Sequence, residues 1–339
     1  MQNKLLNTIA AHQPIAIIIL LIFSFAFPFL VSQSSYILNI ASMALIYAIL
    51  ALSLNLVTGF LGITNLGQAA FFGVGAYTAA ILSTKLNVPF LVTLPLAALM
   101  AGLIGAVLGL ITLRVSGRYL SIVTLGFCEI ARLVELNWFA LTRGPLGIMN
   151  IPAPKIFGFE FDTLTGKYYI VLILTCLVTI ATLHLIQSRT GRAISAIKSD
   201  QLVADVMGIN VKQVKTLVFV VASAIAGLAG GFYAHYISFI DPTSFNYNKS
   251  IQIMSMAILG GMGSIPGSII GAIVLTVLPE LLRDFVLLRQ VLYGVVIIVI
   301  VLFRPAGLLG GINLKHILQK MNFKKELEQR AAVGGSDSE

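Results

Sequence analysis

Long apolar stretches that recur along most of the chain restrict its fold more than any other feature. Of the 339 residues, 58% are hydrophobic and 10% are charged, whereas a soluble domain usually carries about a quarter charged residues. An α-helix needs roughly 20 consecutive apolar residues to cross the hydrocarbon core of a bilayer. The sequence therefore predicts an all-α polytopic membrane protein and argues against an ordinary globular one.

The apolar stretches predict about ten transmembrane helices within a domain that covers residues 1–311. Because ten is an even number, both chain ends are expected on the same side of the membrane. A basic amphipathic segment follows at 312–339, and its last residues are expected to be disordered. The predicted spans are 14–31, 37–58, 66–84, 90–113, 119–136, 168–186, 216–240, 251–262, 265–282 and 287–303.

The distribution of lysine and arginine predicts that both ends lie in the cytoplasm. With that orientation, fourteen of the 22 Lys and Arg residues fall in cytoplasmic segments, six fall outside and two lie within spans. Cytoplasmic loops of membrane proteins carry such an excess of basic residues. The net charge of +9 therefore indicates orientation in a bilayer and is not a signal for nucleic-acid binding.

The longest polar stretch on the predicted cytoplasmic side covers residues 188–215 and is expected to form two short amphipathic helices. The second helix would begin at Ser199, a candidate N-cap, and stop at Gly208. The i,i+4 spacing predicts an apolar face on this helix. That face consists of Leu202, Val203, Val206 and Met207.

An apolar face on a basic loop has two explanations. The loop is either an interfacial linker that lies along the membrane surface or a docking element that sits in a groove of a soluble partner. The spacing of the residues does not separate the two.

Glycine and proline predict two interrupted helices, around residues 59–67 and 260–267. Irregular backbone is tolerated at membrane depth only against protein or a water-filled cavity, and it often marks a transport path. The two segments have the same predicted orientation, which suggests an internal repeat. Polar side chains near the first interruption either face a polar substrate or cap the backbone locally; they are Asn55, Thr64, Asn65 and Gln68.

The predicted fifth span carries three charged residues, Glu129, Arg132 and Glu135, at i,i+3 spacing. Arg132 can therefore pair with either carboxylate. Arg132 and Glu135 are expected near the outer end of the span, where they would snorkel towards water. Glu129 lies deeper, and an ionisable group at that depth suggests either a structural ion pair or a role in permeation or gating.

Residues 137–167 form the longest predicted outside loop, which is a candidate to receive an external partner. The chain has no G-x-x-x-x-G-K-[ST] segment, so no nucleotide-binding phosphate loop is expected. No arrangement of catalytic residues and no metal-ligand spacing is apparent, and Cys128 and Cys176 are expected to be small buried hydrophobes. These observations predict a membrane conduit that has no energy source of its own.

Several motifs, in one order, closely resemble the branched-chain amino-acid ABC permeases of the LivM type. They are LNLVTGFLGITNLGQAAFFGVGAYTAA, LRVSGRYLSIVTLGFCEIARLVELNW, LTRGPLGIMNIPAP, SRTGRAISAIKSDQLVADVMGINVKQVK, AGLAGGFYAHY and LYGVVIIVIVLFRPAGLLG. The resemblance runs from about residue 37 to about residue 310. Within it, Arg143 stands where such permeases more often have glycine.

The resemblance implies an ABC importer permease fold in a bacterial or archaeal cytoplasmic membrane. It also implies a second related permease, two cytoplasmic ATPase subunits that bind ATP and Mg²⁺, and an extracytoplasmic solute-binding protein. This chain itself would bind no cofactor. The loop 188–215 would be the coupling element that contacts an ATPase. Its expected coupling residues are Arg189, Gly191, Arg192, Ser199, Asp200, Leu202, Val203, Ala204, Val206, Met207 and Gly208.

Other functions remain open at this point. A permease of the same family for urea, short amides or another small amino acid or carboxylate would share these motifs. A proton-coupled secondary transporter would make Glu129 central, and a passive channel would need no ATPase. A membrane enzyme is the least favoured class, since no catalytic constellation is present.

Overall fold

The computed structural model describes residues 24–28, 34–112, 118–156, 159–282 and the positions 294–295, 298–299, 302–304 and 307–309. The chain divides into two units, of which one covers 31–310 and the other combines 1–30 with 311–339. In the second unit the described residues are the helical positions 24–28. Most of the predicted spans 14–31 and 287–303, and the whole of the segment 312–339, lie outside the described residues.

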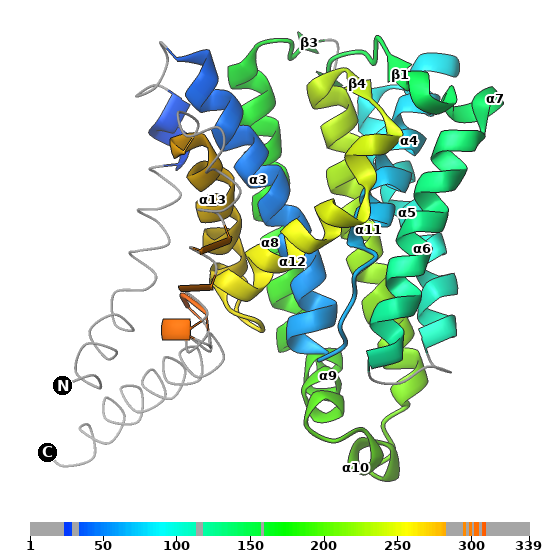
Figure 1. Cartoon of the computed structure of the whole chain (residues 1–339), viewed down its shortest axis with the longest axis vertical. Coiled ribbons are helices and arrows are strands. Elements are labelled where there is room, and N and C mark those ends of the chain that lie inside the picture. Colours follow the sequence, from blue (N-terminus) through cyan, green and yellow to red (C-terminus); the bar gives the residue numbers. More distant parts are fainter. Residues whose placement is uncertain are drawn as a thin grey trace, which may run out of the picture. The chain divides into compact units, whose positions relative to one another are not determined.

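The unit 31–310 is a bundle of long helices with short elements at both ends (Figure 1). Four helical segments among the described residues are long and apolar enough to cross a membrane: Ser35–Phe60, Phe90–Ile111, Leu164–Gln187 and Val211–Ile237. The polytopic all-α prediction is therefore supported. The helices are α3 (Ser35–Asn55), α4 (Gln68–Lys85), α5 (Phe90–Thr112), α6 (Arg118–Asn137), α8 (Leu164–Gln187), α11 (Val211–Ile237), α12 (Tyr247–Gly260) and α13 (Ile265–Leu281).

The predicted span 251–262 is not a complete transmembrane helix. It corresponds to α12, whose 14 residues extend about 21 Å at 1.5 Å per residue, against a hydrocarbon core of roughly 30 Å. A short strand β4 (Phe239–Ile240) and a 3₁₀ turn η3 (Pro242–Phe245) precede it and bring the chain back from the end of α11. This part of the bundle therefore consists of irregular chain followed by a short oblique helix.

Two groups of short elements lie at opposite ends of the bundle (Figure 1). At one end are α9 (Arg189–Ser199) and α10 (Gln201–Val206). At the other, β1 (Ile148–Met149) pairs antiparallel with β4, with Ile148 opposite Ile240. The same end holds α7 (Phe139–Thr142), the turn η2 (Gly144–Leu146) and the hairpin of β2 (Lys155–Ile156) with β3 (Phe159–Glu160). The segments 188–215 and 137–167 are thus separated by the bundle, as their predicted placement on opposite sides requires.

Glycine allows the central helices to approach closely. Helix α11 packs against α4 and α5, while α3 packs against α8 and α13. A Cβ on Gly75 of α4 would lie 2.1 Å from the carbonyl oxygen of Gly227 on α11. One on Gly230 would lie 2.0 Å from the carbonyl oxygen of Phe72. Without a hydrophobic drive between helices in lipid, such small-residue contacts provide much of the packing.

We predict that Gly75→Ala destabilises the protein, whereas Gly126→Ala does not. Alanine favours a helix over glycine by up to about 1 kcal/mol, but overlap at Gly75 should cost about 1–3 kcal/mol and outweigh that gain. A Cβ on Gly126 in α6 would meet no atom within 4 Å. The measurement is the thermal unfolding midpoint of the detergent-purified chain. Equal midpoints for the two variants would contradict this packing.

Candidate coupling element and translocation residues

The segment 188–215 folds as two capped helices, as predicted, but the second cap is a different residue. Asp200 Oδ1 accepts hydrogen bonds from the backbone N–H groups of Leu202 (2.8 Å) and Val203 (3.1 Å). Ser199, the predicted cap, is the last residue of α9, and its hydroxyl donates to the carbonyl of Ser195. Serine and aspartate are both good N-cap residues. Asp200 is the cap here, because its carboxylate can accept hydrogen bonds from both free N–H groups. Gly208 stops the element with φ +84°.

This element has one buried and one exposed apolar surface. Ile194, Ile197 and Ala204 are buried against the rest of the unit. The predicted face of α10 and its C-cap points the other way. There the exposed fractions are 78% for Leu202, 59% for Val203, 87% for Val206 and 77% for Met207.

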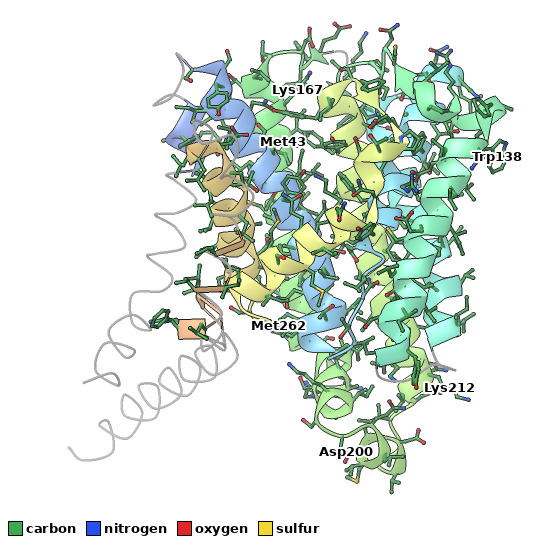
Figure 2. The ribbon with its side chains drawn as sticks, viewed as in Figure 1. Met43, Trp138, Lys167, Asp200, Lys212 and Met262 are labelled. Atoms are coloured by element: carbon green, nitrogen blue, oxygen red, sulfur yellow. The ribbon has the colours of Figure 1, made fainter. Side chains whose placement is uncertain are left out.

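We call these four residues the apolar tip. Figure 2 shows Asp200 at one end of the unit 31–310, away from Trp138. Arg189 and Arg192 are also exposed on α9. The tip therefore combines an unburied apolar patch with nearby positive charge. An exposed apolar patch rimmed by polar groups is typical of a surface that contacts protein or membrane.

The corner between α8 and α9 depends on Gly191. Ser188 accepts a hydrogen bond from the Gly191 N–H and caps α9. A Cβ on Gly191 would lie 1.9 Å from the carbonyl oxygen of Ile186. The chain can therefore turn tightly from the long helix into the exposed element only with glycine at this position.

The two predicted helix interruptions meet in space. The first begins with a π-helical turn, η1 (Leu56–Phe60), and the second lies between α12 and α13. Asn55 Nδ2 donates to the carbonyl oxygen of Ser264 (3.0 Å) and to Ser268 Oγ (2.6 Å), and its Oδ1 accepts from the N–H of Gly263 (2.8 Å). A Cβ on Gly59 would lie 2.4 Å from that same nitrogen of Gly263. Asn55 therefore ties the interruptions together, which favours the capping explanation for this residue.

Asn65 and Gln68 belong to a second buried network. Gln68 Nε2 donates to Ser53 Oγ (2.5 Å), and Gln68 Oε1 accepts from Asn65 Nδ2 (3.1 Å). Asn65 Oδ1 also accepts from the N–H of Gly67 (2.9 Å). Thr64 is half-buried in the extended segment before them. Contact of these side chains with a substrate stays a prediction, because the structure gives Asn65 and Gln68 partners within the protein.

Lys198 connects the exposed element to both interruptions. Its Nζ donates to the carbonyl oxygen of Gly59 at 2.6 Å. A Cβ built on Gly62 would lie 3.2 Å from Lys198 Cγ, and one built on Gly263 would lie 3.8 Å from Nζ. Nothing local in the sequence distinguishes Lys198 from the other basic residues of 188–215, so this contact could not be predicted. Its partner is 139 positions away in the sequence.

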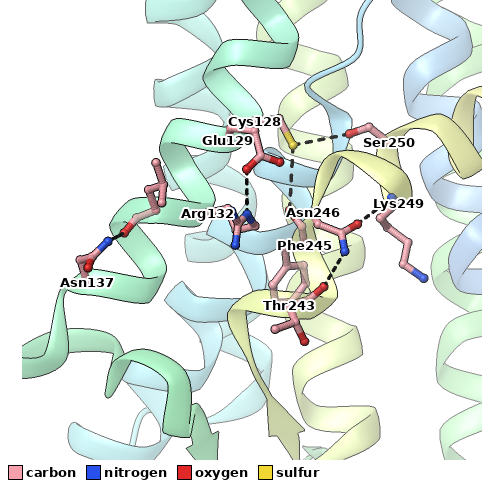
Figure 3. Close-up of polar contacts among 10 residues, drawn as sticks. Cys128, Glu129, Arg132, Asn137, Thr243, Phe245, Asn246, Lys249 and Ser250 are labelled. Carbon is pink, nitrogen blue, oxygen red and sulfur yellow. Dashed lines mark hydrogen bonds and ion pairs between the residues drawn. The ribbon is translucent and has the colours of Figure 1, made fainter.

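The charged residues Glu129, Arg132 and Glu135 of α6 lie in different surroundings from those predicted. Arg132 Nε pairs with Glu129 Oε2 at 2.9 Å (Figure 3), and each side chain is about three-tenths exposed. Glu135 is 6% exposed, and neither carboxylate oxygen has a hydrogen-bond partner among the described residues. The expectation that Glu135 snorkels towards water is wrong, because α6 packs this side chain against Gly73 of α4, where glycine leaves the space.

The structure also shows the surroundings of Arg143 and of the cysteines. Arg143 adopts φ +63° and ψ +11°, a left-handed conformation that costs a side-chain-bearing residue roughly 1–2 kcal/mol. Glycine, the more usual residue there in the resembling permeases, adopts it freely. Cys128 is fully buried, as predicted, and its sulfur also contacts Ser250 Oγ and the carbonyl of Phe245 (Figure 3). Cys176, for which burial was also predicted, is only half-buried. Among the described residues, no group of three or more His, Cys, Asp or Glu side chains is placed to hold a metal ion.

Comparison with known proteins identifies the family. A family model described as "Branched-chain amino acid transport system / permease component" matches residues 36–302. The chain is 36% identical over 320 residues to the high-affinity branched-chain amino acid transport system permease protein LivM of Escherichia coli K12, covering 88% of this chain and 75% of the relative. It is 26% identical over 289 residues to the corresponding permease protein LivH of Salmonella typhimurium LT2, covering 78% and 91%.

An archaeal relative extends the same similarity. The chain is 25% identical over 314 residues to a probable branched-chain amino acid transport permease protein LivM of Methanocaldococcus jannaschii, covering 78% of this chain and 90% of the relative. No solved structure matches. The match of the family model over most of the chain, together with the LivM identity, shows that this chain belongs to the family of permease components of branched-chain amino acid transport systems.

Proposed function

We propose that the chain is the membrane-spanning permease subunit of an ATP-driven importer of leucine, isoleucine and valine. Family membership and the names of the relatives support this substrate class. Relatives named LivM and LivH are both permease proteins of such systems, and both resemble this chain. That supports pairing with a second, homologous permease. The chain itself hydrolyses no ATP; two ATPase subunits would bind ATP and Mg²⁺.

The proposed topology places the α9–α10 end in the cytoplasm. Ten spans with both termini inside, in a bacterial or archaeal cytoplasmic membrane, agree with the excess of basic residues in the segments on that side. The domain would then cover 1–311, followed by the basic cytoplasmic segment 312–339.

The apolar tip is the observation that carries the coupling proposal. Four large apolar side chains project from a capped element, and Asp200 and Gly208 fix both ends of its second helix. An amphipathic helix that lies in a groove of a soluble partner buries such an apolar face on binding. The partner would be a cytoplasmic ATPase. Further contacts would come from exposed flanking residues, which are Arg189, Arg192, Ser199, Asp200 and Gly208. Gly191 and Ala204 are buried and would act by shaping the element.

Lys198 provides a physical route from that contact to the membrane domain. Because α9 is held to the carbonyl of Gly59, a displacement of the exposed element acts directly on the junction between the two helix interruptions. ATP binding by the ATPases would favour one of two conformations of the permease pair, and hydrolysis would favour the other. An alternating-access cycle of this kind needs only a differential contact free energy between the two states.

The segment 137–167 is the proposed receiver for the loaded solute-binding protein. It lies at the end of the bundle opposite the apolar tip (Figure 1). Several large side chains at or within this segment are exposed there, including Trp138 (54%), Phe139 (63%), Leu146 (70%) and Phe159 (75%). Exposed aromatic residues outside the bilayer are typical of protein contact surfaces.

Transport by the complete, reconstituted complex tests the function. We expect ATP-dependent and binding-protein-dependent uptake of labelled leucine, with competition by isoleucine and valine but not by urea. Competition by urea alone would favour the small-amide permease. Uptake driven by a pH gradient without the ATPases would establish the secondary transporter, and uptake without any energy source would establish a channel.

In the same vesicles, Val203→Asp should greatly reduce leucine uptake while membrane insertion stays normal. A buried charge in the ATPase contact would be desolvated without a partner, which costs several kcal/mol. Leu86→Asp is the matched control, since Leu86 is 66% exposed at the end of α4. Unchanged uptake by Val203→Asp would contradict the assignment of the apolar tip.

Lys198→Met should keep ATPase binding but lower the amount of leucine transported per ATP hydrolysed several-fold. The variant keeps most of the apolar stem and removes the charge-assisted hydrogen bond to Gly59, a contact usually worth about 1.5–3 kcal/mol. Lys212→Met is the control, because Lys212 is exposed in the same basic segment. Equal coupling ratios in both variants would show that the Lys198 contact does not transmit the movement.

A further inference from the structure

The Glu129–Arg132 pair lines a cavity that the coupling mechanism does not use. The cavity has a volume of about 550 Å³ and lies between α6 and the start of α12. Leu125 and Tyr247 supply apolar walls, while Asn246 and Asn248 add amide groups. Figure 3 shows the ion pair facing the turn that contains Thr243 and Asn246. The cavity therefore joins one positive and one negative group to an apolar surface.

The depth of this pair argues that the cavity contains water or a polar ligand when the protein is in a membrane. Glu129 is eight residues before the end of α6, so it lies about 12 Å along the helix from that end. Both side chains are about three-tenths exposed on the surface of the chain. Partly exposed charges at such depth are costly against lipid and normally face a polar pathway.

The hydrogen bonding of Arg132 leaves its carboxylate-binding edge available. Only Nε is used in the described structure, by Glu129 Oε2 at 2.9 Å. That bond orients the guanidinium plane, and both terminal amino groups stay available to the cavity. Two parallel N–H donors are the arrangement with which arginine binds a carboxylate. The second carboxylate oxygen of Glu129, Oε1, is similarly available to a cation.

We propose that this cavity is a substrate subsite that binds the zwitterionic head group of an amino acid during translocation. The inference rests on the proposed function and adds the residues that recognise the substrate. Arg132 would bind the α-carboxylate, Glu129 would bind the α-ammonium, and Leu125 with Tyr247 would contact the aliphatic side chain. Since the head group replaces bonds to water with bonds to an oriented pair, the site accepts the substrate without leaving either charge unpaired.

The test uses the purified transporter complex in nanodiscs, without the solute-binding protein. The probe is the diazirine analogue of leucine, which is photoactivated and located by peptide mass spectrometry. We expect labelling within 118–137 or 242–260 that excess leucine prevents. Competition by 4-methylpentanoate, which lacks the ammonium, or by 3-methylbutylamine, which lacks the carboxylate, should be at least about tenfold weaker, as expected when one charge-assisted contact is lost.

Variants then separate a substrate site from a structural ion pair. Arg132→Gln should raise the probe concentration for half-maximal labelling by about tenfold or more. A merely structural pair would be harmed by either single change but restored in the double variant Glu129→Gln/Arg132→Gln, because no unpaired charge is left. A subsite predicts that the double variant labels no better than Arg132→Gln. Neutralising the exposed Lys155–Glu160 pair is the control. This pair lies in the segment proposed to receive the solute-binding protein, and because the assay omits that protein, labelling should stay unchanged.

Wild-type labelling and recovery in the double variant decide the outcome. Full recovery of labelling by the double variant would overturn the proposal. So would the absence of leucine-protected labelling at these segments in a wild-type complex that takes up leucine, and in that case the proposed function would stand. A wild-type complex that takes up no leucine in the presence of its binding protein would overturn both.

Discussion

Backbone amide and carbonyl groups released inside a membrane must be satisfied by the protein itself, and the arrangement of this bundle follows from that constraint. Both helix interruptions free such groups. Asn55 bonds two backbone groups of the second interruption, the carbonyl of Ser264 and the N–H of Gly263, and Lys198 bonds one backbone carbonyl of the first. These bonds hold the two interruptions beside each other. The α9–α10 element is attached to the first interruption because Lys198 of α9 donates a hydrogen bond to the carbonyl of Gly59.

This dependence explains why the exposed α9–α10 element and the two interruptions are held together. The glycines that open the helices also remove the side chains that would keep the two interruptions apart, as the 2.4 Å approach of a Cβ on Gly59 to the Gly263 nitrogen shows. Polar side chains in the core are used to hold backbone in place. Those of α6 that face a cavity, Glu129 and Arg132, are by contrast partly exposed and bonded mainly to each other.

The regular parts of the fold could be predicted from sequence because apolar length and local capping decide them. The spans around α3, α5, α8 and α11, and the pair of short helices at 188–215, depend on contacts close in the chain. The choice of Asp200 over Ser199 was missed because adjacent residues of similar capping preference compete. The shortness of α12 was missed because an apolar composition does not reveal where the backbone becomes helical.

Long-range contacts were beyond a single sequence. The bond from Asn55 to Ser264 crosses 209 positions, and that from Lys198 to Gly59 crosses 139. Glu135 illustrates the same limit, because its burial depends on Gly73 of another helix leaving room for a carboxylate. The glycines were visible in the sequence as small residues suited to packing. What each of them packs against could be known only from the folded chain.

Helix α11 connects the two ends of the bundle. It starts three residues after Gly208 and runs without a break for 27 residues, about 40 Å, to Ile237. Two residues later, β4 begins and is hydrogen-bonded to β1 of the segment 137–167. One continuous helix thus spans the distance between the end of the bundle that carries α10 and the end that carries β1 and β4, so a tilt of α11 moves both of its ends together.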